Sequence, residues 1–508
     1  MKHFIRTLLS ISFGLTVAGL FALPARATTY SLTTSSACTI SDAIIASNTD
    51  SVSGSCPSGS GNDTIDLAAG TYTLSADLPA ITSELTINGA SKTSTLIDGN
   101  NHQYSGILAV ATGTLSINNL SIQNMKIGAV MGSWGCYGSG LCSIDTNLNL
   151  THVTIQNNQN CGISSTRASG GTDGNALTFD DVMSINQIAG DPSLPFICGL
   201  FVLNDGTTTN PDHITISDSS FSDNSSATSG NFVIGIFIQK NSLLNLANST
   251  LSGNRNIDTV GLGLITGERG VTLTNVTISD NGTTNADILS VAGIYASYDT
   301  IPISLKNVLL AKNAVNGAAA NCGAALYSNL SAGHNLSDDA TCASYFNKSG
   351  DKNSLDAKIG NLALDSNTYV IPLLADSPAI NAGTSDGAPA TDQRGVSRPQ
   401  GSAFDIGAYE YQFGGGGGGG SGGGDSDNGG AENYIGNILP RVGRWMAWLA
   451  PIALAAMVTF AYVYLDWKRH KRRIDAIKAD NNYTLWHHLR VVTFPLFRYR
   501  LRLEVDHK

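Results

Sequence analysis

Charged side chains are scarce in this 508-residue sequence. They make up 13% of the chain, about half the share usual in globular proteins. Basic residues are scarcest in residues 28–413, where 13 Lys and Arg face 31 Asp and Glu, a net charge of −18. A surface of that sign excludes nucleic acid as a partner. The hydrophobic content of 42% excludes a solvated, disordered polymer and predicts a large core.

Signatures of several enzyme classes are also absent. The sequence has no phosphate-binding loop, nucleotide motif or Ser-His-Asp signature. It has no Cys-x-x-Cys and no pair of histidines near its cysteines, which argues against a zinc site. Arg167, Arg255 and Arg269 are the only arginines between residues 28 and 393, and we expect them to be solvated charges. No cofactor is expected, and Ca²⁺ enters only if the protein is a calcium-dependent lyase.

Both ends of the chain carry targeting features. Residues 1–27 start with basic residues, continue with an apolar stretch and end in Ala-Arg-Ala, the pattern of a cleaved signal peptide. Residues 446–465 form an uncharged apolar run of 20 residues, which is long enough to cross a bilayer as a helix. The basic cluster at 468–473 follows this run, and the positive-inside rule therefore places the C-terminus in the cytoplasm.

These features predict a single-pass membrane protein of the cell envelope. Its body lies outside the cytoplasm, in the periplasm or at the cell surface, and the membrane is one partner. The predicted parts are a signal peptide (1–27), an exported body (28–413), a Gly-rich linker (414–440), a transmembrane helix (446–465) and a basic cytoplasmic tail (466–508).

All eight cysteines lie in the body. An even number of cysteines in an oxidising compartment predicts disulfides, although many pairings are open. The simplest pairing joins neighbours in the sequence, namely Cys38 with Cys56, Cys136 with Cys142, Cys161 with Cys198 and Cys322 with Cys342.

A short pattern recurs along the body. Apolar residues alternate with polar ones, and the pattern ends in Asn, as in 148–158 and 244–254. The second apolar residue of each copy serves as an anchor, with a mean step of about 31 residues. Such alternation is typical of strands, so the repeat predicts an all-β parallel solenoid in which anchors stack from coil to coil. The anchors are Ile87, Ile117, Leu150, Phe179, Ile216, Leu246, Leu273 and Leu305.

Asparagines and caps complete the predicted solenoid. The Asn that ends each copy predicts a stacked ladder at a bend, because Asn tolerates the left-handed conformation and its amide bonds to the next Asn. The solenoid ends need caps. Residues 41–48 predict a short capping helix, and residues 370–411, which lose the repeat and gain prolines, predict a closing segment. The ladder members are Asn158, Asn224, Asn254, Asn281 and Asn313.

Both caps resemble a bacterial family. Residues 38–44, Cys-Thr-Ile-Ser-Asp-Ala-Ile, resemble the Cys-Ser-Leu-Arg-Glu-Ala motif, with Ser41 where the family usually has Arg. Residues 377–383, 392–395 and 405–410 are similar to the end of the choice-of-anchor Q domain. The resemblance implies a right-handed parallel β-helix like that of pectin lyases, on exported proteins that differ in their anchor. It implies no established activity and no catalytic residues.

Asp180 and Asp181 are the candidate catalytic residues. They resemble the paired aspartates of polygalacturonases, but the repeat places both at polar turn positions, which favours a structural role. Two functions stay open. The favoured one is a membrane-tethered structural, adhesive or glycan-binding module whose Ser/Thr/Asn-rich face meets a polysaccharide or a surface protein. The alternative is a polysaccharide lyase or glycoside hydrolase acting on an acidic polymer.

Overall fold

A computed structural model describes most of the exported body. The chain divides into two compact units, residues 1–417 and 418–508. The predicted linker, transmembrane helix and tail lie outside the described residues, as does nearly all of the predicted signal peptide. Within the part that is described, no helix is long and apolar enough to cross a membrane. The described residues are 26–102, 104–126, 138–167, 174–190, 196–204, 210–225, 232–239, 241–256, 258–265, 270–283, 292–296, 302–323 and 330–413.

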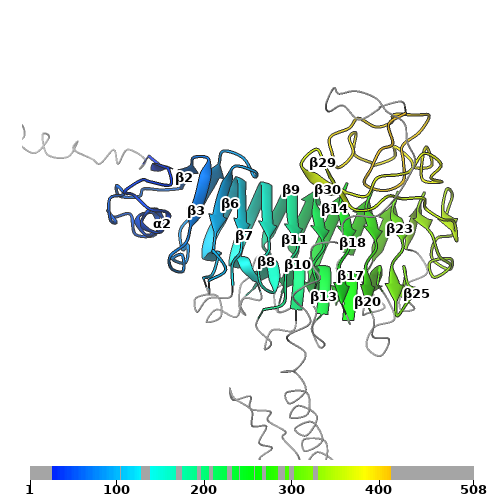
Figure 1. Ribbon diagram of the computed structural model, residues 1–508, viewed down its shortest axis with the longest axis horizontal. Coiled ribbons are helices and arrows are strands. Elements are labelled where there is room, and N and C mark those ends of the chain that lie inside the picture. The colour runs from blue at the N-terminus through cyan, green and yellow to red at the C-terminus, as the bar shows by residue number, and fades with distance from the viewer. Residues whose placement is uncertain are drawn as a thin grey trace, which may run out of the picture. The chain divides into compact units, whose positions relative to one another are not determined.

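Parallel strands wind into successive coils (Figure 1). Three strands of the first face continue around bends, namely β6 (Ile107–Gln123), β7 (Gly138–Gln156) and β9 (Ala176–Ile185). The other strands of the first face are β1 (Thr29–Leu32), β2 (Asp63–Leu67), β4 (Leu85–Gly89), β11 (Asp212–Ser217), β14 (Ser242–Ala247), β18 (Gly270–Thr274), β22 (Ile303–Lys306) and β26 (Ser331–Gly333).

Each coil continues through two further faces. The second face holds β3 (Gly70–Thr73), β5 (Thr95–Asp98), β12 (Ser220–Ser222), β15 (Thr250–Ser252), β19 (Thr277–Ser279), β23 (Leu309–Ala311), β27 (Leu336–Ser337) and β28 (Lys352–Asn353). The third face holds β8 (Cys161–Thr166), β10 (Phe196–Leu203), β13 (Phe232–Gln239), β17 (Asp258–Ile265) and β21 (Ile294–Ala296). A small separate sheet is formed by β16 (Arg255–Asn256), β20 (Gly282–Thr283), β24 (Ala314–Val315) and β25 (Ala318–Ala319).

The core is a stack of inward apolar side chains. The predicted anchors lie in register, with Ile87 opposite Ile117, Ile117 opposite Leu150, and so on to Leu305. Every anchor is at most 1% exposed, and burying one such side chain stabilises the fold by about 1.5–3 kcal/mol. The register confirms the parallel β-helix, whereas its predicted right hand stays a prediction.

The predicted asparagines form a buried ladder in which Gln187 occupies the position between Asn158 and Asn224. Each side-chain oxygen accepts a hydrogen bond of 2.9–3.3 Å from the backbone N–H of the residue at the same position one coil earlier. Most side-chain nitrogens donate to a backbone carbonyl of the preceding coil. The left-handed residue is not the ladder Asn but the one before it, because the bend must precede the side chain that points inward. These residues are Asn157, Asn186, Asp223, Gly253, Asp280 and Lys312.

The N-terminal cap is helix α2 (Ile40–Thr49), which matches the predicted helix over 41–48. Thr39 caps it by accepting a hydrogen bond from the N–H of Asp42 and donating one to the carboxylate of Asp42, at 3.1 and 2.8 Å. Three of the four predicted disulfides are present: Cys38–Cys56, Cys161–Cys198 and Cys322–Cys342. Cys142 is also disulfide-bonded, and its predicted partner, Cys136, lies outside the described residues.

The closing segment folds back over the coils and includes the hairpin β29 (Ala363–Asp365) and β30 (Thr368–Val370). In Figure 1 this yellow segment lies along the upper edge of the green strands. Three ion pairs of two arginines hold it together: Arg398 with Glu410 at 2.8 Å, both fully buried at their side chains, Arg394 with Asp392 at 2.7 Å, and Arg394 with Asp365 of the hairpin at 2.8 Å.

Replacing Asn254 with Ala should lower the free energy of unfolding by about 3 kcal/mol, because buried backbone groups on Phe221 and Asn224 lose their partners. Equilibrium unfolding in urea measures the change. Asn245→Ala, an exposed change on the same coil, is the control and should cost less than about 0.5 kcal/mol. An equal loss in both variants would show that the ladder contributes nothing specific.

Candidate functional site

A column of left-handed residues joins the first face to the second. One residue per coil occupies this bend, with φ between 43° and 57°. Asn and Asp adopt this conformation more readily than other residues with a side chain. In chain order the column is Asn119, His152, Asp181, Asp218, Asn248, Asn275 and Asn307.

The closing segment covers the asparagine end of this column. Asn248 donates to the carbonyl of Thr391 at 2.7 Å, and Asn275 and Asn307 donate to further carbonyls of the segment. At the other end, the carbonyl of Lys92 accepts a hydrogen bond from Ser121, which places the loop of Lys92 over the next coil. The titratable rungs of the column lie between these two contacts.

Five titratable residues lie at or beside this bend, and we name them the bend cluster: Lys92, His152, Asp180, Asp181 and Asp218. Lys92 Nζ lies 2.6 Å from Asp181 Oδ1, and His152 Nδ1 lies 2.8 Å from Asp181 Oδ2. Asp180 Oδ1 accepts a 2.8 Å hydrogen bond from Ser217, on the next coil. The structure therefore brings the two predicted aspartates to one bend but gives them different partners.

The acidity of Asp218 is altered by its surroundings. Burial raises its pKa to about 6. The hydrogen bond with Asn248 acts in the opposite direction, and the charges of Asp180, Asp181 and Asp392 raise the pKa further. A carboxyl that stays protonated to mildly acidic pH, beside a His–Asp pair, has the composition of an acid–base site. Among the described residues, no group of three or more His, Cys, Asp or Glu side chains is arranged to hold a metal ion.

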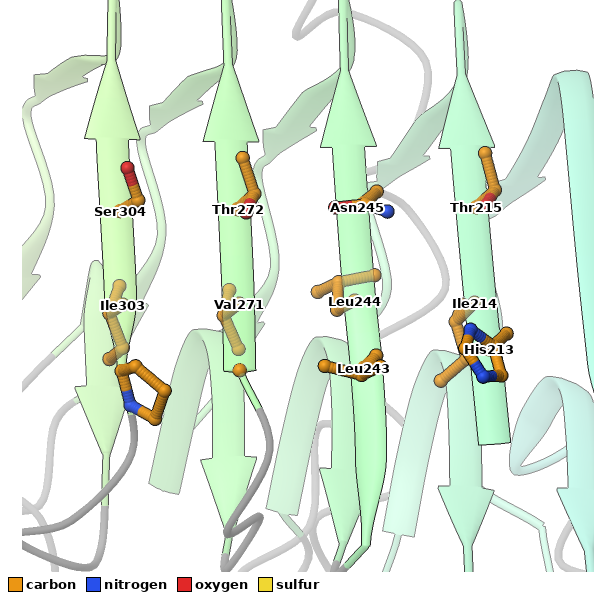
Figure 2. Close-up of a pocket in the computed structure, with 12 residues that line it drawn as sticks. His213, Ile214, Thr215, Leu243, Leu244, Asn245, Val271, Thr272, Ile303 and Ser304 are labelled. Carbon is orange, nitrogen blue, oxygen red and sulfur yellow. The ribbon is translucent and has the colours of Figure 1, made fainter. Parts of the chain in front are cut away.

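A shallow groove crosses the outside of the first face (Figure 2). Its volume is about 340 Å³, and it runs over β11, β14, β18 and β22. Figure 2 shows Thr215, Asn245, Thr272 and Ser304 in one line across these strands. All four are exposed, since the alternate residues on each strand point into the core.

The groove is part of a longer line of side chains, which we name the outer row. Consecutive strand pairs place one hydroxyl or amide residue of each coil opposite the next. None of the side chains carries a charge. The outer row consists of Thr29, Thr64, Thr86, Ser116, Asn149, Thr178, Thr215, Asn245, Thr272 and Ser304.

Three residues of the bend cluster, His152, Asp218 and Lys92, were not predicted from the sequence. His152 and Asp218 occupy the repeat position of Asp181, so a column-by-column alignment of the copies would have found them. Lys92 lies in a loop outside the repeat and had no signal. The expectation for Arg167 is wrong: it is buried and pairs with Asp212 at 3.1 Å, because a coil edge shields both. Arg255 is 63% exposed as expected, and Arg269 lies outside the described residues.

Replacing Asp181 with Asn should lower the free energy of unfolding by about 3 kcal/mol, because the nearly buried ammonium of Lys92 loses its counter-ion. Urea unfolding measures the loss. The double variant Lys92→Met with Asp181→Asn removes both charges and should recover most of it. A single variant as stable as the wild type would show that the ion pair does not support the bend.

Asp218 should make the body more stable in acid than at neutral pH. Its pKa is raised on folding, so the folded state holds the proton more tightly, and this stabilisation is lost as the pH rises from about 4 through about 6. Asp218→Asn stays neutral, so it should exceed the wild type by about 2 kcal/mol at pH 7 and match it at pH 4. Urea unfolding at both pH values tests this, with the exposed Asp50→Asn as control. A pH-independent difference for Asp218→Asn would contradict it.

Comparison with known proteins gives only remote similarity. No protein-family model matches this chain, and no curated protein sequence matches it. The crystal structure of pectate lyase Pel9A is 15% identical, with a TM-score of 0.40 over 77% of this chain and 98% of its own. Pectin methylesterase from carrot is 12% identical, with a TM-score of 0.25 over 60% and 86%. The chain is thus a parallel β-helix protein by its own strand register, and its membership of the choice-of-anchor Q family stays a prediction.

Proposed function

We propose that the body is an extracytoplasmic glycan-binding module that holds an extended, uncharged polysaccharide along the outer row. The observation that carries this proposal is the row itself. Ten hydroxyl or amide side chains follow one another without a charge, at the coil spacing of about 4.8 Å. Hydroxyls and amides both donate and accept hydrogen bonds, as the hydroxyls of a polysaccharide do.

The charge of the body favours a neutral ligand. Residues 28–413 have a net charge of −18, which repels anionic polymers at long range. The outer row contributes no basic group to offset that repulsion. An acidic polysaccharide is therefore a poorer fit than a neutral one.

The groove supplies apolar contact beside the polar row. Leu243 and Pro302 line it together with the row residues. A volume of about 340 Å³ lies at the small end of the range for ligand sites and fits a short stretch of a longer chain. Contact of the C–H groups of a sugar with these side chains would add dispersion energy to the hydrogen bonds.

The location outside the cytoplasm is supported by the three described disulfides, which persist in oxidising compartments. The predicted signal peptide and transmembrane run agree with it. If that run spans the membrane, the Gly-rich linker would tether the module at the surface and leave the body free to meet a polymer.

The bend cluster favours a second candidate, a glycoside hydrolase. Asp181 and Asp218 occupy adjacent rungs of the bend column, and glycosidases use a pair of carboxyls that flank the scissile bond. Asp218 would donate the proton to the leaving oxygen. The ion pairs of Asp181 count against this candidate, because they occupy the carboxylate that would act as nucleophile.

The purified full-length chain should be retarded by at least one neutral polysaccharide in affinity electrophoresis. The probes are hydroxyethylcellulose, laminarin and galactomannan, with polygalacturonate and alginate as acidic probes. The triple variant Thr215→Val, Asn245→Ala, Thr272→Val should weaken retardation at least tenfold, or about 1.4 kcal/mol. The control Thr71→Val, Thr73→Val changes exposed residues on β3 and should bind as the wild type does.

Retardation by the acidic polysaccharides alone would contradict the proposal, and so would the absence of retardation by every probe. Reducing ends released by the wild type but not by Asp218→Asn would establish the hydrolase instead. Variants Asp180→Asn and Asp181→Asn should leave binding nearly intact if the protein is a binding module.

A further inference from the structure

A pocket of about 460 Å³ lies at the second bend of the coils, between the second and third faces. It is bounded on one side by side chains of successive coils and on the other by Tyr369 of the closing hairpin, whose strand β30 packs beside β9 and β12. The pocket is separated from the outer row by the whole second face. A ligand seated here would therefore be independent of one lying on the row.

The coil side of the pocket presents amide groups. Asn186 donates a hydrogen bond to Asn157 Oδ1, one coil below, and Gln156 donates to Gln123 Oε1 at 2.9 Å. Each of these bonds uses one polar atom of the side chain, which leaves Asn186 Oδ1 and Gln156 Oε1 as acceptors and Asn157 Nδ2 as a donor. The amides are thus held in place by the stacking of the coils before any ligand arrives.

Two charged side chains, Arg255 and Asp223, lie next to the amides. Arg255 Nε donates to the carbonyl of Asp280 at 2.8 Å, and this bond fixes the guanidinium at the pocket. Asp223 lies against Gly253, which is the one glycine among the left-handed residues of the second bend. A Cβ at Gly253 would approach Asp223 Oδ1 to 2.2 Å. The φ of +69° at Gly253 also suits glycine. Glycine therefore makes room for the carboxylate that lines the pocket.

Tyr369 supplies the aromatic wall. The backbone carbonyl of Tyr369 accepts a 2.9 Å hydrogen bond from Gln393, whose side chain also bonds to Thr368 and Thr250. These contacts dock the hairpin on the coils through the Tyr369 carbonyl and the Thr368 hydroxyl, and within the described residues the Tyr369 ring makes no hydrogen bond. The half-buried Tyr369 lines the pocket, and an aromatic ring there offers an apolar surface to a ligand.

We propose that this pocket binds one uncharged pyranose unit, such as a chain end or side branch of the polysaccharide assigned to the outer row. The C–H face of the sugar packs on Tyr369, and its hydroxyls bond to the amides of Asn157 and Asn186. Asp223 accepts from one hydroxyl and Arg255 donates to another. Asp280 pairs with Arg255 at 3.5 Å, so the carboxylates beside the pocket outnumber its one guanidinium, and the pocket selects a neutral sugar over a uronate. The assignment rests on the proposed function and adds a second contact to it.

Ligand-observed NMR on the full-length chain tests the assignment with methyl glucoside, methyl galactoside, methyl mannoside, methyl N-acetylglucosaminide and glucuronate. At least one neutral glycoside should bind, and Tyr369→Ala should weaken that binding at least tenfold. Leu364→Ala is the matched control, since Leu364 is the exposed cross-strand partner of Tyr369 and does not line the pocket. It should bind as the wild type does.

A second variant keeps the assignment testable even if Tyr369→Ala does not fold. Asn186→Gly removes a pocket amide at a residue with φ of 54°, which glycine adopts without strain, and it should also weaken binding. Binding of glucuronate alone, no binding by any neutral glycoside, or full binding by Tyr369→Ala would overturn the assignment. Failure here is distinguishable from failure of the outer row, because the triple row variant should keep glycoside binding while losing polymer retardation.

Discussion

The stacking of inward side chains in register is the constraint on which the whole body depends. Leu150 must meet Phe179 one coil on, and Phe179 must meet Ile216, because a single coil cannot bury its own apolar face. A slip of one residue would turn every anchor outward. Once the anchors are aligned, every other position of the repeat is aligned too, so bends and outward side chains also form columns. The buried amide ladder strengthens the same register at the second bend.

Aligned columns turn a sequence repeat into continuous surfaces. The outer row arises because one outward position per coil holds Thr, Ser or Asn, and no separate device is needed to assemble it. Such a surface is long and chemically uniform, which suits a polymer better than a compact ligand. The Tyr369 pocket has the opposite character: it is small, mixed in chemistry and built where a non-repeating segment meets the repeat. The outer row and the Tyr369 pocket, the two ligand contacts that we propose, therefore lie on opposite sides of the second face.

The closing segment stabilises the end of the solenoid and also covers the part of the bend column that begins at Asn248. Its buried charges pair internally, Arg398 with Glu410 and Arg394 with Asp392, so the strongly acidic body does not leave a buried guanidinium without a counter-ion. Its carbonyls accept hydrogen bonds from the side chains of Asn248 and the later asparagines of the column. The uncovered rungs hold the bend cluster, where Lys92 neutralises Asp181 and burial keeps Asp218 protonated to higher pH than an exposed carboxyl.

The sequence alone determined the coils, because periodicity is a local property: each anchor, the ladder asparagines, the capping helix and the paired cysteines follow from spacing and residue type. In the structure Asp181 occupies a left-handed bend, whereas Asp180 is still a paired strand residue. Only the tertiary structure decided which rungs the closing segment covers, that Lys92 reaches Asp181, and that Tyr369 closes a pocket. These contacts join a repeat to segments without one, over sequence separations such as 89 residues between Lys92 and Asp181. Periodicity carries no information about where a non-repeating segment docks, so the surfaces it creates appear only in the folded chain.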